Sequence, residues 1–136
     1  VYFFKQFMVR AMLIAVLITI GLQGNAQTES RITRYNYFFL EAIRQQEMGN
    51  LAAAFDLLNH ARDINPKAPE VYYEIAGYYV AMQNSKAARY NFEQAAKLAP
   101  DNSTYLEKLG QFYISQNNYE DALTTYEQLY TSNKTR

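Results

Sequence analysis

The chain has 136 residues, a formal net charge of zero and no cysteine. Its length suits one small domain with a modest core. The 13 basic and 13 acidic side chains are scattered without a long run of either sign, which argues against nucleic acid as a partner. The lack of cysteine excludes a disulfide framework, thiolate catalysis and Cys-ligated zinc.

Residues 1–26 have the pattern of a secretory signal peptide. Lys5 and Arg10 precede the apolar run AMLIAVLITIGL, and Gly24 and Ala26 supply the small residues of a cleavage site. The run is shorter than the about 20 apolar residues that span a bilayer. Because aromatic residues extend it upstream, an uncleaved N-terminal membrane anchor is the alternative. The signal ending NAQ and the richness in Tyr and Asn resemble a Gram-negative envelope protein, so we predict a periplasmic location, with membrane contact only through this segment.

The rest of the chain repeats with a period of 34 residues. Sliding the sequence against itself by this distance places small residues on small ones and large residues on large ones. The superimposed sets are Ala54, Ala88 and Ala122; Leu58, Phe92 and Tyr126; Phe38, Tyr72 and Leu106; Ala42, Ala76 and Gly110; and Asn50, Asn84 and Asn118. We therefore predict a linker or helix start at 27–34 and three repeats at 35–68, 69–102 and 103–136.

The residue pattern of each repeat predicts two antiparallel helices, A and B, joined by a short polar turn. In the second repeat, apolar residues at i, i+3, i+4 and i+7 predict helix A at about 69–82 and helix B at about 85–98. Glu70 lies in the first turn of its helix, where a carboxylate is favourable. The spacing of Thr104 and Glu107 predicts a capping box at the start of the third A helix.

Small residues are predicted where helices A and B cross, because a larger side chain there would push the axes beyond the about 8–10 Å of close packing. Large side chains of the partner helix fill the space beside them. The predicted repeat-packing set is Ala54, Leu58, Tyr72, Ala76, Tyr79, Ala88, Phe92, Ala95, Gly110, Tyr113, Ala122 and Tyr126. An aromatic stripe at helical spacing is usually core, and we interpret these aromatic residues as structural.

These residues resemble the tetratricopeptide repeat (TPR) family, whose 34-residue helix-turn-helix unit carries a bulky aromatic residue, Leu-Gly, Tyr, Ala, Phe or Tyr, Ala and Pro in that order. The second repeat matches at Tyr72, Ile75, Ala76, Tyr79, Ala88, Phe92, Ala95 and Pro100, and the third at Leu109, Gly110, Tyr113, Ala122 and Tyr126. The resemblance implies an all-α fold, a short right-handed α-solenoid of three repeats after a signal peptide. It also implies a non-catalytic protein–protein interaction module, a scaffold or adaptor.

The resemblance further implies a concave groove that is lined by the A helices and binds a peptide or a partner's helix. Carried over by repeat position, its lining would be Asn36, Phe39, Leu40, Ile43, Glu47, Tyr73, Glu74, Gly77, Val80, Glu107, Lys108, Gln111 and Ile114. Some family members grip a C-terminal carboxylate with Lys, Asn and Arg at places that here hold Phe39, Ile43, Glu74, Thr104 and Lys108. Since only Lys108 is basic, we do not expect this mode of recognition.

No other motif indicates chemistry. HExxH, GxSxG and a Gly-rich phosphate loop are absent, and the single histidine, His60, falls among exposed helix B positions. We predict no enzyme activity, no catalytic residue, no metal site and no cofactor, and another protein or peptide as the partner.

The alternative function is a structural spacer or a self-associating segment of a larger TPR protein with no external ligand. A solenoid normally closes with a polar capping helix, and no such helix follows the third repeat in this sequence. We expect either a longer chain or a second subunit, in a homo-oligomer, to cover the apolar face at this end.

Overall fold

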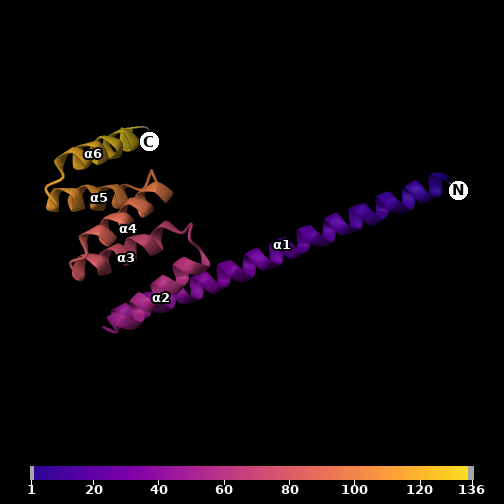
Figure 1. Ribbon diagram of the computed structural model, residues 1–136, viewed down its shortest axis with the longest axis horizontal. Coiled ribbons are helices and arrows are strands. Elements are labelled where there is room, and N and C mark those ends of the chain that lie inside the picture. Colours follow the sequence, from indigo (N-terminus) through magenta and orange to yellow (C-terminus); the bar gives the residue numbers. More distant parts are fainter. Residues whose placement is uncertain (1, 135–136) are drawn as a thin grey trace. The chain divides into compact units, whose positions relative to one another are not determined.

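A computed structural model describes the backbone of residues 2–134 and, apart from residues 2–4 and 7, their side chains (Figure 1). Its helices are α1 (Tyr2–Glu47), α2 (Leu51–Ile64), α3 (Pro69–Ala81), α4 (Ser85–Leu98), α5 (Ser103–Ser115) and α6 (Tyr119–Lys134). Residues 2–134 contain no strand, which confirms the all-α prediction. The two helices predicted for the second repeat agree with α3 and α4 to within one residue.

The chain forms two compact units, Val1–Arg34 and Tyr35–Arg136. Residues 27–34, predicted as a linker or helix start, lie within α1, which is already helical from Tyr2 onward. Over Met8–Glu47, α1 is the one helix in the described part of the chain that is long and apolar enough to cross a membrane, a property that signal sequences share. Signal-peptide cleavage and periplasmic location stay predictions.

The second unit is a stack of helical hairpins. The last turns of α1 pair with α2, α3 with α4, and α5 with α6, and successive hairpins meet where α2 packs on α3 and α4 on α5 (Figure 1). Within the first hairpin, the rings of Phe38 and His60 meet edge-on with their centroids 4.3 Å apart. Helices α2 to α5 have only 13 or 14 residues, a length at which an isolated helix is marginal in water, so packing between the hairpins maintains them.

The turn between helices A and B has the same backbone in all three repeats. Gly49, Gln83 and Asn117 adopt φ values of +81°, +57° and +57°, the left-handed conformation that ends a helix. The backbone N–H of the asparagine that follows each of them then donates to the carbonyl five residues back, on Gln45, Tyr79 and Tyr113, at 2.9 Å. Only the first repeat has glycine at this position, although an L side chain is disfavoured there.

The predicted capping box at Thr104 and Glu107 is wrong. Helix α5 begins at Ser103, and the side chain of Asn102 accepts a hydrogen bond from the Tyr105 N–H at 3.2 Å. Asparagine is among the best N-cap residues because its short side chain reaches the unpaired N–H groups of the first turn. A residue upstream of Thr104 therefore already fills the capping role.

The core consists of two clusters of buried side chains. One joins the first two repeats around Leu58, Val71 and Ile75, and the other joins the last two around Phe92 and Leu106. Ten members of the repeat-packing set are buried, and Tyr79 and Tyr126 are half-buried.

The close crossing of α5 and α6 occurs at Gly110. A Cβ atom on this residue would lie 2.8 Å from Cε2 of the Tyr126 ring, closer than ordinary contact. Glycine at this position therefore lets the ring of the partner helix lie against the backbone of α5.

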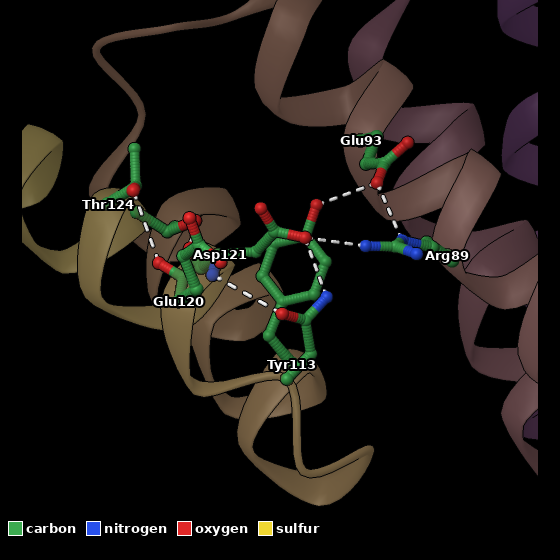
Figure 2. A network of polar contacts seen from close by, with 8 residues as sticks. Arg89, Glu93, Tyr113, Glu120, Asp121 and Thr124 are labelled. Carbon is green, nitrogen blue, oxygen red and sulfur yellow. Dashed lines mark hydrogen bonds and ion pairs between the residues drawn. The ribbon is translucent and has the colours of Figure 1, made fainter.

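A polar network fixes the third repeat against the second (Figure 2). Arg89 of α4 donates from Nε to Glu93 Oε1 at 3.0 Å and from a terminal nitrogen to Asp121 Oδ2 of α6 at 2.7 Å. The Tyr113 hydroxyl of α5 donates to the same Glu93 oxygen at 2.6 Å, and the Arg89 guanidinium lies 5.1 Å from the Tyr113 ring centroid. Asn118 Nδ2 donates to Asp121 at 2.6 Å and fixes that carboxylate.

Candidate functional site

None of the predicted groove residues is buried. Phe39, Ile43, Tyr73 and Glu74 are half-buried, and Glu47, Val80, Lys108 and Gln111 are exposed. All of them lie on A helices of the second unit, namely the end of α1, α3 and α5. Their role in binding stays a prediction.

Phe39 belongs to a stack that joins the first two repeats. Its ring lies parallel to that of Tyr35, with an interplanar angle of 17° and centroids 5.8 Å apart. Tyr35 is buried, and its hydroxyl donates to Glu70 Oε1 of α3 at 2.6 Å. This hydrogen bond ties the A helix of the first repeat to the A helix of the second.

Tyr73 joins the second repeat to the third. Its ring centroid lies 5.1 Å from that of Tyr105 on α5 and 6.3 Å from that of Phe92 on α4. Tyr73 packs against both core clusters. Replacing Tyr73 would therefore disturb the fold as well as any groove contact.

A hollow of about 250 Å³ opens between the first two repeats. It is lined by Gln46, Leu51, Glu74, Gly77, Tyr78 and Ala81. The Tyr78 hydroxyl donates to Gln46 Oε1 at 3.1 Å across the hollow's edge. A Cβ atom on Gly77 would meet no other atom within 4 Å, so the space above this glycine is open.

Glu74 gives this hollow a carboxylate. Burial raises the pKa of Glu74 above its ordinary value, and a hydrogen bond with Gln46 offsets part of that increase. The ion pairs among residues 2–134 are Arg44–Glu41, Arg62–Asp63, Arg89–Glu93 and Arg89–Asp121. Neither Glu70 nor Glu74 has a basic partner among them. Within the same residues, no three His, Asp or Glu side chains are grouped so that they could hold a metal ion.

The third repeat presents a polar surface instead. Lys108 Nζ donates to Gln111 Oε1 at 3.5 Å, and Gln111 Nε2 donates to Glu107 Oε1 at 3.2 Å. All three side chains are exposed. These contacts stay within one face of α5 and close no cavity.

Four residues that lie beside the predicted groove residues were not predicted from the sequence: Tyr35, Gln46, Glu70 and Tyr105. Glu70 occupies the repeat position of Asn36, and Gln46 that of Val80, so the 34-residue shift could have identified both. Tyr35 and Tyr105 occupy different repeat positions. No periodic signal relates these two tyrosines, and only the packing of the A helices places them at this surface.

Residues 79–130 match the family model described as the tetratricopeptide repeat. This part of the chain is tetratricopeptide repeat sequence. The matched span runs from the last turn of α3 through most of α6. The first repeat lies outside this span, and its assignment rests on the 34-residue shift and on the packing of α1 with α2 in the first core cluster.

Solved structures share the fold. A crystal structure of MamA is 16% identical with a TM-score of 0.67, over 74% of this chain and 59% of that one. A structure of MamA 41-end from Desulfovibrio magneticus RS-1 is 15% identical with a TM-score of 0.63, over 72% of this chain and 58% of that one. The chain thus spans less than two thirds of the MamA structures that it resembles. No curated protein matches the chain.

Proposed function

We propose that this TPR protein is a non-catalytic interaction module of the bacterial cell envelope that binds a peptide or a partner's helix in the groove of its A helices. One observation carries the proposal. Large side chains that build the repeats are buried, whereas the A-helix residues at groove positions stay accessible and border an open hollow beside Gly77. An accessible concave surface with aromatic edges suits a partner segment, because aromatic side chains bury a large area at low entropic cost.

The envelope location rests on the N-terminal segment. Its basic residues, apolar helix and small residues suit export, as a cleaved signal or as an anchor. Fractionating cells that express the full chain, followed by N-terminal sequencing of the product, tests this part. A mature chain beginning near residue 27 in the periplasmic fraction, or an intact chain in the inner membrane, would support export, whereas recovery in the cytoplasm would contradict it.

Site-specific photo-crosslinking in cells tests the groove. A photoreactive residue replaces Val80, which is 47% exposed in the groove, or Tyr90, which is 55% exposed on α4 and serves as the matched control. We expect a crosslinked partner at position 80 and none at position 90. The variant Gly77→Gln fills the hollow without a clash at its Cβ, and should abolish the crosslink while the chain stays folded. Equal crosslinking at both positions would contradict a groove-specific partner.

A second candidate function, self-association, is favoured by the outer surface of α6. Tyr119, Leu123 and Tyr130 are 64%, 62% and 70% exposed and follow one another at helical spacing. Light scattering of the full chain in a non-ionic detergent, at several concentrations, would detect growth of the oligomer. If this surface is the interface, Leu123→Asn should yield a monomer that keeps the Val80 crosslink.

A further inference from the structure

We propose that the groove accepts a basic segment, with a Lys or Arg side chain placed in the hollow beside Glu74 and a second basic contact at Glu70. The inference rests on the proposed function, because it assigns the chemistry of the partner that the same groove would bind. It reverses the polarity of the carboxylate-gripping mode described above. Three features of the structure support it: the charges of Glu70 and Glu74, the shape of the hollow and the aromatic rings around the carboxylates.

The partners of Glu70 and Glu74 within the chain are neutral: the Tyr35 hydroxyl for Glu70 and the Gln46 side chain for Glu74. Glu70 and Glu74 lie four residues apart on α3, on one side of the helix, where like charges repel. Both are half-buried, and neither takes part in an ion pair of residues 2–134. Taking a carboxylate partly out of water without a cation costs free energy, and a partner's cation would relieve that cost.

The shape of the hollow suits an apolar stem with a charged end. Leu51, Gly77 and Ala81 supply apolar walls, while Glu74 and Gln46 supply oxygen atoms. Lys and Arg bury their methylene stems on apolar surface while the charged head stays in a polar environment. An acidic or neutral side chain would leave Glu74 repelled or unpaired in this space.

Aromatic rings stand on both sides of the carboxylates. Tyr35 and Phe39 stack on the side of the first repeat, and Tyr73 and Tyr105 on the side of the third. The carboxylates of Glu70 and Glu74 both raise the pKa of Tyr105, after the larger effect of burial, so this ring lies in their negative field. Tyr35 is buried, whereas Phe39, Tyr73 and Tyr105 keep part of their rings accessible, and such rings attract Lys and Arg in addition to the carboxylates.

Selection from a random-peptide phage library tests the proposal on the full chain, held in a non-ionic detergent. We expect the selected sequences to be enriched severalfold in Lys and Arg over the input library. The isosteric double variant Glu70→Gln, Glu74→Gln should lose this enrichment. The charge-matched double control Glu120→Gln, Glu127→Gln, at exposed positions of α6, should keep it.

The strongest selected peptide is then resynthesised with its key basic residue replaced by norleucine, and fluorescence anisotropy measures both affinities. We expect about a tenfold loss for norleucine on the unaltered chain, which corresponds to about 1.4 kcal/mol. On Glu74→Gln the two peptides should bind equally, because the partner of the basic residue is gone. Helicity and urea midpoints of the variants would show that the fold is retained.

The outcomes separate the two proposals. Selected peptides without basic enrichment, whose binding Gly77→Gln still abolishes, would overturn the basic-segment proposal and leave the groove function standing. If no sequence is enriched above a blank surface, or if Gly77→Gln changes nothing, both proposals fail. Enrichment in acidic residues would overturn the charge assignment directly.

Discussion

The two junctions between repeats use equivalent positions with opposite chemistry. At the first, Phe55 of α2 meets Tyr79 edge-on and Tyr78 at a tilt, each at a centroid distance of 5.4 Å. A shift of 34 residues carries Phe55 to Arg89 and Tyr79 to Tyr113, so at the second junction a guanidinium replaces the ring. Arg89 is then joined by Glu93 and Asp121 in the network of Figure 2.

This difference shows that the repeat fixes where the contact between two hairpins lies but not the type of side chain that makes it. Phe55 is half-buried and Arg89 exposed, at the edge of the helix packing, so this position can hold an apolar ring or a solvated charge. The fully buried positions beside it, such as Ala54 and Ala88, have no such freedom because any larger side chain would separate the helices. The stabilities of the two junctions should therefore respond differently to salt. Burial of apolar area is insensitive to salt, whereas salt screens an exposed ion pair.

The largest effect is expected at the aromatic junction. Phe55→Ala removes contacts with Tyr78 and Tyr79, and should lower the free energy of unfolding by roughly 2 kcal/mol, less than for a fully buried ring. Urea unfolding of the full chain followed by tyrosine fluorescence measures this, because nearly all tyrosines lie in the second unit. The loss should be the same at low and high salt, and a loss that shrinks in 1 M salt would contradict the apolar assignment.

A smaller, salt-dependent effect is expected at the polar junction. Arg89→Met keeps much of the stem but removes the guanidinium, and should cost about 1 kcal/mol at low salt, because exposed pairs contribute little individually and a network somewhat more. At about 1 M salt the Debye length falls to about 3 Å, and much of the difference should disappear. The matched control is Lys86→Met, a neighbouring exposed cation on α4 outside this network. Equal losses for both variants would mean that the network contributes nothing specific.

Replacing Asn91 of the second repeat by leucine, the residue type at the equivalent position of the first repeat, should stabilise the fold slightly. Asn91 is 3% exposed, its Oδ1 lacks a hydrogen-bond partner, and the equivalent residue of the first repeat is Leu57. Asn91→Leu should raise the free energy of unfolding by about 0.5 kcal/mol, because it removes an unpaired buried oxygen at little cost in volume. The urea midpoint measures the change, and a lower midpoint would show that the Asn91 Nδ2 contact with the Ala87 carbonyl matters more.

The last effect, absent at neutral pH, is an alkaline pH dependence at the polar junction. Burial, and then the hydrogen bond to Glu93, raise the pKa of Tyr113 to about 12. Because the folded-state pKa lies above the unfolded value of about 10, the neutral phenol contributes stability fully below pH 10, and this contribution is lost as the pH rises through 12. Tyr113→Phe should therefore show a shallower loss of stability over this window. Identical alkaline profiles for both chains would contradict the assignment.

The repeated helices of this protein could be predicted from the sequence. The 34-residue shift located the helices of the second repeat to within one residue, because small residues at helix crossings and apolar i, i+4 spacing are local requirements of the packing. The capping residue of α5 could not be predicted from the sequence, because Asn102 and Thr104 are both good capping residues. Only the backbone conformation decides which of them reaches the free N–H groups.

The candidate site could be predicted from the sequence only in part. Repeat position predicted Glu74 and Gly77 as groove residues, and both line the hollow. Neither the partnership of Tyr35 with Glu70 nor the network around Arg89 repeats in the chain, so the shift could not reveal them.

By itself, then, the sequence determined the repeat, its helices and the small residues at their crossings, because each depends on contacts that recur at a fixed spacing. Only the tertiary structure decided which polar groups meet across the junctions and which carboxylates stay without a cation. Those contacts join residues about 20 to 35 positions apart, and they depend on how one hairpin is placed on the next.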